Sequence, residues 1–465
     1  MKKIKIYVLA LFVGVAFTAC DDLLELDPQA SISDDIALST PGNIQTAIVG
    51  GYAALSSVNA YGGSYVYLTD ILAAPQDEIY FNGTFTQPRE VNDKEMLISN
   101  SFVAGYWNTS YNIINRANNV LSAIDVVTDA ADRERLEAEA HFLRGVVYYN
   151  LVVAFGKAYN DGDPSSNLGV PLVLQPTRII DDNLKVSRAT VQAVYDQIID
   201  DLEFARDNLP PDNGVFANEF TASAMLARVH LTMGNYTEAG TEASRVIESD
   251  NYTLFADIRE NFNRTSNGSE TIFAMQNTPT DFRNDMATFY TPQPYGRADI
   301  QIRDAHLDTY EAGDLRATLF VETGRGRMVT RYHDEDTSVD PRRTNISIIR
   351  LAEMHLIRAE ANMRLTGSGV AGIGGVTPEA DLNPLRDRVN LAPLAAATLD
   401  DVLRERRAEL AFEGHFLTDL KRLEGTTQSL AEGVVQWNDN SLVFPIPERE
   451  TNVNENLVQN PGYID

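Results

Sequence analysis

A single cysteine in a chain of 465 residues limits what can hold the fold together. Cys20 has no partner for an intramolecular disulfide, and the cysteine and histidine residues do not have the spacing of a zinc site. The composition, 44% hydrophobic and 22% charged, is that of a globular protein. The fold must therefore be stabilised by a buried apolar core together with hydrogen bonds and ion pairs.

The position of Cys20 explains why it is present. Residues 1–5 carry three lysines, residues 6–17 are apolar, and small residues precede the cysteine, which is the pattern of a secretory signal peptide. The apolar run is shorter than the roughly 20 residues that a membrane-spanning helix needs. A cysteine directly after the cut resembles a bacterial lipoprotein signal. We therefore expect residues 1–19 to be removed, Cys20 to be lipidated and residues 20–40 to form a tether; an ordinary secretory signal with an incidental cysteine is the alternative.

The charge balance argues against one class of partner. The chain has 38 lysine and arginine residues against 66 acidic residues, a formal charge of −28. Binding to a phosphate backbone needs clustered basic side chains that displace counterions. We therefore expect no nucleic-acid partner.

From Pro41 onward the hydrophobic pattern is mostly helical, with two long interruptions. The pattern predicts helices over 44–56, 102–124, 132–155, 190–208, 221–233, 237–249, 351–365 and 398–422. The segments 59–100 and 251–343 do not hold a helical period, and only short pieces such as 271–275 and 327–332 have strand-like sequences. The glycine-rich stretch 367–378 is expected to be a connector.

One helix pair resembles a known repeat. The helix predicted at 221–233 is followed by a Gly234-Asn235-Tyr236 turn and by a second helix with Ala239 and Ala243 on its inner face. This arrangement resembles a tetratricopeptide unit, and weaker copies of its first helix occur at 140–145 and 354–361. The alternative is a set of unrelated amphipathic helices.

Motifs for cofactors, metals and catalysis do not have the required context. A G-x-G-x-x-G match at 367–372 follows a helix instead of a strand, so it indicates a loop. The acidic stretches 161–165 and 334–336 lack the glycine and glutamate of a calcium-binding EF-hand loop and indicate solvated loops. A glycosidase needs two carboxyl groups roughly 5–10 Å apart, and the sequence does not single out such a pair. We expect no cofactor, no metal site and no catalytic residue.

Three glutamates, Glu405, Glu409 and Glu413, lie four residues apart on one face of a predicted helix. Like charges at this spacing repel by a few tenths of a kcal/mol unless cations intervene. Arg406 and Arg407 are the predicted partners. The pattern therefore indicates a structural ion network.

Several short motifs follow one another in order along the chain. They are Asp21-Asp22 after the cysteine, Trp107-x-x-x-Tyr111-x-x-Ile114 followed by Asn118, Leu143-Arg144-Gly145 followed by Tyr148-Tyr149, Tyr310-Glu311-Ala312-Gly313-Asp314-Leu315-Arg316, the stretch 403–415 continued by Asp419-Leu420-Lys421-Arg422, and the ending Phe444-Pro445-Ile446-Pro447 with Gln459-Asn460-Pro461-Gly462-Tyr463. Together they resemble the SusD/RagB family of outer-membrane nutrient-binding lipoproteins of Bacteroidetes over nearly the whole chain. One departure is Phe416, where the family usually has arginine after the Gly-His pair.

The resemblance implies a fold and a function. The fold is mainly α, a single domain over 41–465, with tetratricopeptide-like helical repeats that support an irregular, loop-rich ligand-binding half with a few short strands. The function is capture of an oligosaccharide or polysaccharide at the cell surface for a SusC-like TonB-dependent transporter, over which the protein sits as a lid. The chain would be anchored to the outer membrane by its N-terminal lipid, and no enzymatic step is implied.

The chemistry of sugars selects candidate ligand-binding residues. A sugar ring stacks its C–H faces on aromatic rings and bonds its hydroxyl groups to Asn, Asp, Gln and Arg, so aromatic residues in the irregular segments are the best candidates. The candidates are Tyr80, Phe81, Asn82, Phe85, Arg89, Asp281, Phe282, Asn284, Tyr290, Tyr295, Arg297 and Trp437. The alternative is that these side chains pack the irregular half, as Trp107 is expected to pack the helical core.

Other functions remain open on the sequence alone. Arg283 and Arg297 would suit a peptide-capturing lid of the same family, because they can bind backbone carbonyl or carboxylate groups. A glycoside hydrolase and a helical-repeat scaffold that binds only proteins are the other two alternatives.

Overall fold

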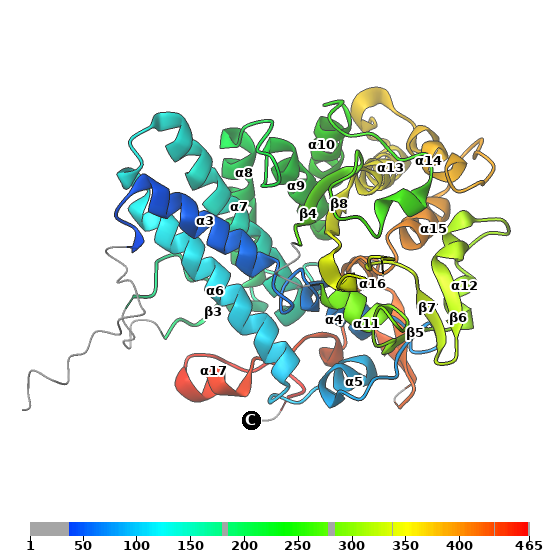
Figure 1. The fold of residues 1–465 in the computed structure, drawn as a ribbon, viewed down its shortest axis with the longest axis horizontal. Coiled ribbons are helices and arrows are strands. Elements are labelled where there is room, and N and C mark those ends of the chain that lie inside the picture. Colours follow the sequence, from blue (N-terminus) through cyan, green and yellow to red (C-terminus); the bar gives the residue numbers. More distant parts are fainter. Residues whose placement is uncertain (1–36, 179–184, 278–283, 337, 432, 464–465) are drawn as a thin grey trace, which may run out of the picture.

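The computed structural model describes residues 37–178, 185–277, 284–336, 338–431 and 433–463. Within these residues the chain forms a helical half and a half in which short strands and helices alternate (Figure 1). The predicted signal peptide, Cys20 and the candidate ligand residues Asp281 and Phe282 lie outside the described residues. The mainly α architecture that the sequence predicts is confirmed.

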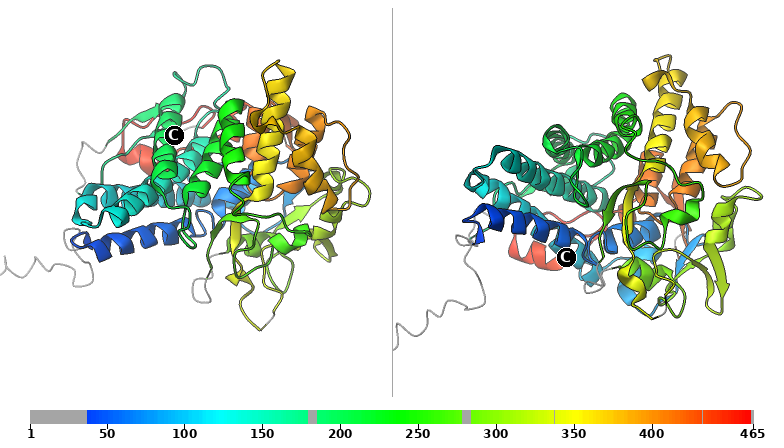
Figure 2. Two further views of the ribbon diagram at one scale, coloured as in Figure 1. Left: turned by 90° about the horizontal axis from the view of Figure 1, so that it is seen from above. Right: turned by 45° about the horizontal axis from the view of Figure 1, so that its top comes forward.

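The helical half is a row of helices in which each packs on the next (Figures 1 and 2). Its members, in packing order, are α3 (Pro41–Leu55), α6 (Ser101–Ala123), α7 (Ala130–Phe155), α8 (Val191–Asn208), α9 (Glu219–Met233), α10 (Tyr236–Ile247) and α13 (Leu351–Gly367). Each of these was predicted from the sequence, with ends that differ by a few residues. Trp107 of α6 is 3% exposed, which confirms its place in the core.

The helix pair α9–α10 shows why the sequence gives this packing. Gly234 ends α9 with a φ of 81°, a conformation that glycine adopts without strain. Ala239 and Ala243 of α10 are fully buried. A Cβ atom on Gly240 would lie 3.2 Å from the Cβ atom of Ala361 in α13. Small side chains therefore allow α10 and α13 to approach closely.

The second half contains short helices and antiparallel strand pairs. Its helices are α4 (Ser64–Ala73), α5 (Thr86–Asp93), α11 (Asp285–Tyr290), α12 (Asp304–Leu307), α14 (Pro378–Asp387), α15 (Leu399–Glu409), α16 (Phe416–Arg422) and α17 (Glu448–Val453). A four-stranded sheet has the order β1-β5-β7-β6, formed by Ile79–Phe81, Ile300–Ile302, Gly326–Val329 and Phe320–Thr323. Two-stranded sheets join β4 (Thr271–Met275) to β8 (Ile346–Arg350), β2 (Leu168–Pro171) to β3 (Arg188–Thr190), and β9 (Thr426–Ser429) to β10 (Gly433–Gln436).

Two expectations about helices were wrong. The segment 59–100 contains α4 and α5, and α4 escaped notice because all ten of its residues are buried and leave no polar face to set a period. The helix predicted over 398–422 is broken into α15 and α16, because Phe412 and Gly414 have φ values of 66° and 85°. Asp70, at the end of α4, accepts hydrogen bonds from the backbone N–H groups of Gly414 (3.1 Å) and Phe416 (3.3 Å) and so holds this break.

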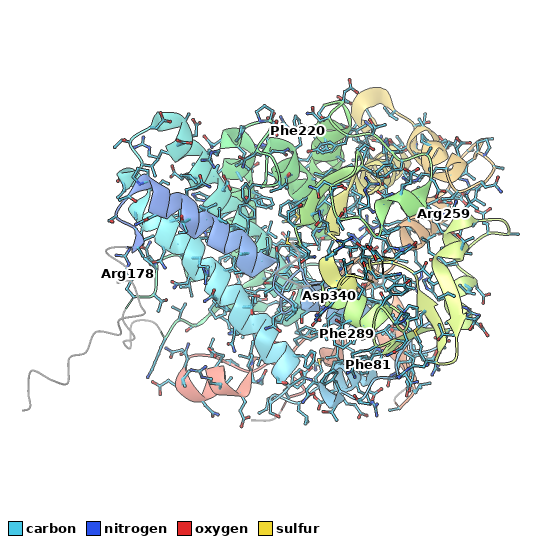
Figure 3. All side chains as sticks on the ribbon, in the orientation of Figure 1. Phe81, Arg178, Phe220, Arg259, Phe289 and Asp340 are labelled. Atoms are coloured by element: carbon cyan, nitrogen blue, oxygen red, sulfur yellow. The ribbon has the colours of Figure 1, made fainter. Side chains whose placement is uncertain are left out.

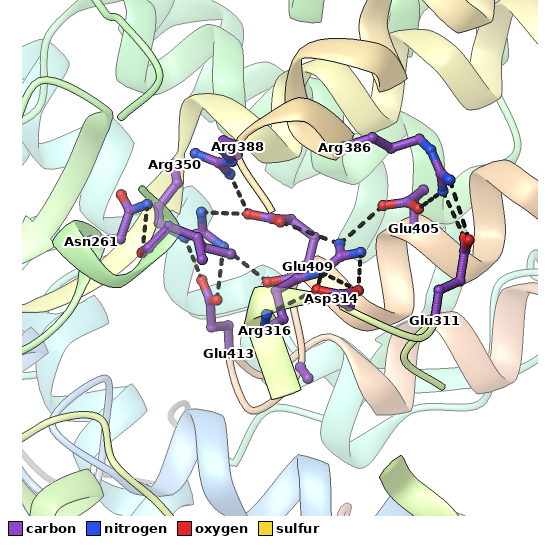
Figure 4. A network of polar contacts seen from close by, with 12 residues as sticks. Asn261, Glu311, Asp314, Arg316, Arg350, Arg386, Arg388, Glu405, Glu409 and Glu413 are labelled. Atoms are coloured by element: carbon purple, nitrogen blue, oxygen red, sulfur yellow. Dashed lines mark hydrogen bonds and ion pairs between the residues drawn. The ribbon is translucent and has the colours of Figure 1, made fainter. Parts of the chain in front are cut away.

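A buried network of ion pairs surrounds the last turn of α15 (Figure 4). Glu409 is fully buried and lies 3.0 Å from Arg350, and it also contacts Arg388 and Arg316. Glu270 lies 2.8 Å from Arg350 and 2.6 Å from Arg388. Burial alone would raise the pKa of Glu409, but the three guanidinium groups outweigh this effect and hold its pKa at about 2.

The predicted partners of the three glutamates were wrong, although the ion network itself is confirmed. Glu405 pairs with Arg316 and Arg386, which come from distant segments. Arg406 instead pairs with Asp419 at 2.9 Å, and Arg407 pairs with Glu78. The reason is helical geometry: residues one and two positions after an inward-facing glutamate point about 100° and 200° away from it.

We expect Glu409→Ala to lower the free energy of unfolding by about 3–5 kcal/mol, because Arg350, Arg388 and Arg316 are left without a carboxylate in a buried site. Denaturant unfolding followed by circular dichroism measures the change. Asp125→Ala is the matched control, since Asp125 is 98% exposed and pairs with Arg133 at 3.8 Å, and we expect no measurable effect. Equal stability of the two variants would show that the network contributes nothing.

Asp70 gives a pH-dependent expectation. Burial raises the pKa of this carboxyl to about 8, above its usual value near 3.8. The folded chain therefore binds an extra proton between about pH 4 and pH 8, and this contribution to stability is lost as the pH rises through that window. Asp70→Asn keeps an acceptor for Gly414 and cannot ionise. We expect its free energy of unfolding to fall less steeply from pH 5 to pH 8, by up to about 1.4 kcal/mol per pH unit. Parallel curves in urea unfolding would contradict this.

Candidate functional site

The outer face of the four-stranded sheet carries the best-formed candidate site. In β1 and β5, Ile79, Phe81, Ile300 and Ile302 point inward and are at most 2% exposed. Tyr80 lies opposite Gln301 in the register of the two strands, and both are half-buried on the outer face. Because side chains alternate along a strand, the sheet packs the core with one face and presents Tyr80 and Gln301 on the other.

A shallow depression of about 600 Å³ lies over this outer face. Its polar lining comes from Asp77, Gln301, Arg303, Asp304, Glu322 and Arg327. The guanidinium carbon of Arg303 lies 4.2 Å from the centre of the Tyr80 ring. Arg327 is 2.7 Å from Asp304 and also contacts Glu322. The depression is therefore lined by donors and acceptors whose positions are fixed by one another.

The rim of the depression is formed by Phe85 and Arg297. Phe85 is 39% exposed, and the guanidinium carbon of Arg297 lies 4.7 Å from the centre of its ring. Arg297 donates to Asp299 at 2.7 Å, and Arg325 lies 3.8 Å from the same carboxylate. The backbone carbonyl of Arg325 accepts a hydrogen bond from the Gln301 amide. Rim and depression thus form one continuous surface.

The turn between β1 and α5 places Phe85 and depends on a glycine. The backbone N–H of Asn82 donates to the carbonyl of Asp299 at 2.7 Å, and the Asn82 side chain is exposed. A Cβ atom on Gly83 would lie 2.6 Å from the Phe81 ring and 2.7 Å from Asp299 Cγ. Arg89, an exposed residue of α5, donates to the carbonyl of Gly83 and holds the turn.

Three candidates belong to the framework instead of the ligand surface. Phe81, Asn284 and Tyr290 are fully buried. Phe81 packs against Phe289, 6.2 Å between ring centres (Figure 3), and Asn284 caps α11 by accepting from the backbone N–H of Ala287 at 3.0 Å. The side chains face inward because these residues sit in a strand and short helices, where alternate positions pack the core. They offer no surface to a ligand in this structure.

Tyr295 and Trp437 lie apart from Tyr80. Tyr295 is half-buried on the loop before β5, where it stacks on His333 with 4.4 Å between ring centres and donates to the carbonyl of Glu335. Trp437 is half-buried just after β10, and its backbone N–H donates to the carbonyl of Gly425. Neither side chain lines the depression.

Sequence reasoning missed the polar residues of β5 and its neighbours, chiefly Gln301, Arg303 and Arg327. The alternation Ile300-Gln301-Ile302-Arg303 has the period of two that marks a half-buried strand, and this signal was available. A three-residue strand is too short for the period to stand out from a segment of mixed sequence. The pairing of β5 with β1, more than 200 residues away, is set by the tertiary fold.

Two chemical possibilities were checked against the same residues. Among the described residues, no group of three or more His, Cys, Asp or Glu side chains is placed to hold a metal ion. Within that part of the chain, no helix is both long and apolar enough to cross a membrane. The candidate site is thus a polar binding surface with aromatic residues, mounted on a helical-repeat scaffold.

A scaffold of this kind with a separate binding half is the architecture of the SusD superfamily. The family model described as the SusD family matches residues 264–463, and a second model, described as starch-binding associating with outer membrane, matches residues 33–231. A SusD superfamily protein from Bacteroides thetaiotaomicron has the same fold, with a TM-score of 0.77, 25% identity and coverage of 91% of this chain and 100% of that one. The chain is a SusD-like family protein.

Curated relatives agree with this assignment. The SusD-like protein P2 of Formosa agariphila is 26% identical, and the alignment covers 100% of both chains. The starch-binding protein SusD of Bacteroides thetaiotaomicron is 25% identical over 77% of each chain. The family is described by carbohydrate binding and by association with the outer membrane.

We expect Gly83→Ala to destabilise the protein by about 1–3 kcal/mol, because the added methyl group collides with the Phe81 ring and Asp299. Gly324→Ala is the matched control, since no heavy atom lies within 4 Å of a Cβ atom there. Denaturant unfolding compares the two. Equal stability would show that the turn at Gly83 moves freely to accept a side chain.

Proposed function

We propose that this chain captures neutral oligosaccharides or polysaccharides on the outer face of its four-stranded sheet. The observation that carries the proposal is the pairing of Tyr80 with Gln301, flanked by Arg303, on a polar depression. The tyrosine offers a ring for stacking, and amide and guanidinium groups lie around it for hydrogen bonds. The carbohydrate-binding description of the family supports the same ligand class.

The mixture of charges in the depression favours a neutral ligand. Asp77, Asp304 and Glu322 accept hydrogen bonds, whereas Arg303 and Arg327 donate them. A sugar hydroxyl both donates and accepts, so one sugar can satisfy both kinds of side chain. A polyanion would meet the three carboxylates and be repelled by them.

The sequence supplies the rest of the proposed role. Lipidation of Cys20 would anchor the chain to the outer membrane after removal of residues 1–19, with residues 20–40 as the tether and 41–465 as one surface-exposed domain. In this arrangement the protein acts as a lid that passes its ligand to a SusC-like TonB-dependent transporter. It carries out no reaction on that ligand.

A second candidate is capture of peptides by a lid of the same type. Arg297 and Arg325 at the rim have side chains that are 41% and 48% exposed. Guanidinium groups bind carboxylates in a bidentate manner, so the rim suits the carboxylate of a peptide. Isothermal titration of the soluble domain with soluble starch, a β-glucan, alginate and a mixture of peptides separates the two. Binding of peptides without binding of any neutral glycan would overturn the carbohydrate proposal.

We expect Tyr80→Ala to weaken binding of the glycan identified in that titration by about tenfold or more, because loss of the ring removes a contact of roughly 1–1.5 kcal/mol and frees Arg303. Tyr236→Ala is the matched control: Tyr236 lies in α10, and the guanidinium carbon of Arg364 is 5.0 Å from its ring centre, so it removes the same kind of contact away from the sheet. An equal loss of affinity in both variants would contradict the assignment of the site.

A further inference from the structure

A second cavity opens between α4, α12, α15 and α16. It has a volume of about 550 Å³, within the range of roughly 300–1,000 Å³ that is usual for small-ligand sites. Leu403, Leu420, Leu423 and Phe416 form apolar walls. We call this cavity the α15–α16 cleft; apart from Ala305, which lines both, its walls do not overlap those of the depression on the sheet.

Arg406 brings a buried donor to the α15–α16 cleft. Its side chain is 3% exposed, its Nε atom lies 2.9 Å from Asp419, and its Nη2 atom lies 3.3 Å from Nδ1 of His415. Burial lowers the pKa of His415 well below its usual value, so the neutral ring accepts this hydrogen bond. The Nη1 atom of Arg406 is buried and has no hydrogen-bond partner in the part of the chain that the structure describes.

Two further arginines of α15 line the same cleft. The Nε atom of Arg404 is also buried and without a partner among the described residues, while its Nη2 atom is held by Asp401 at 2.7 Å. Arg407 lies over the Phe416 ring, 5.0 Å from its centre, and donates to Glu78. The cleft therefore combines apolar walls with guanidinium N–H groups that the protein itself does not satisfy.

We propose that the α15–α16 cleft is a second binding site, for a small organic carboxylate with an apolar body. The carboxylate accepts a hydrogen bond from Nη1 of Arg406, and Arg404 supplies a second donor on the same wall. The apolar body packs against Leu403, Leu420 and Phe416 and removes their surface from water.

The ligand class follows from the charges and from the walls. A guanidinium group only donates, so the ligand must offer an acceptor, and a charged acceptor forms the stronger bond. Burial alone would raise the pKa of Asp419, but Arg406 and Arg422 hold it at about 2, so this carboxylate is already paired. A cation would be repelled by the arginines, and a sugar would lose the hydration of its hydroxyl groups against the leucine side chains.

The test uses 3-phenylpropionate and its uncharged amide as probes of the soluble domain, with titration followed by ligand-observed NMR and calorimetry. We expect the carboxylate to bind at least about tenfold more tightly than the amide. Arg406→Lys keeps a cation beside Asp419 and removes Nη1, so we expect about a tenfold loss of affinity. We expect a smaller loss in Arg404→Met, and no loss in the matched control Arg245→Met, whose side chain in α10 is similarly exposed (47% against 40%).

Thermal unfolding shows which variants are folded. Leu423→Trp fills the cleft without removing a charge, and we expect it to abolish binding of 3-phenylpropionate, so the test stands even if Arg406→Lys does not fold. Tyr80→Ala should leave this binding unchanged, which separates the cleft from the sugar-binding proposal. No binding by the wild-type chain, equal binding of the amide, or unchanged affinity in folded Leu423→Trp would each overturn the proposal.

Discussion

The buried ion network around Glu409 is the constraint on which the rest of this fold depends. It joins Glu270 just before β4, Arg350 at the end of β8, Arg388 just after α14 and Arg316 in the 3-10 helix Leu315–Leu319. Buried charges are tolerated only when each has a partner, so these segments are held in one relative arrangement. A shift of α15 by one residue would turn Glu409 away from all three arginines.

That arrangement also fixes the candidate site. The chain leaves the network at Glu413 and turns back at Phe412 and Gly414, where Asp70 accepts from the backbone. Asp70 lies in the last turn of α4, and β1 follows a few residues later. Tyr80 therefore lies on a strand whose starting point is tied to the network through α4. The sugar-binding proposal needs this rigidity, because an aromatic platform is effective only if the polar groups around it keep their places.

How far the sequence predicts this structure depends on whether the signal is local. The pair α9–α10 is recognisable because Gly234, Ala239 and Ala243 mark its end and its contacts within 25 residues. The spacing of Glu405 and Glu409 predicts an ion network, but Arg316 and Arg350 join it only through tertiary folding. Within the site, Phe85 and Arg297 were predicted from side-chain chemistry, and the structure places them in contact; their role in binding stays a prediction.

The net charge of −28 acquires a different meaning once the sites are in view. The network around Glu409 and the pairs in the depression set carboxylates against arginines, so the acid excess lies elsewhere on the protein. At long range this excess repels polyanions, whereas at contact distance the depression presents both signs. The α15–α16 cleft differs from the depression in having donors, on Arg406 and Arg404, that no carboxylate of the described chain satisfies. Two sites with different charge balance within one acidic domain would select a neutral sugar at one and a carboxylate at the other.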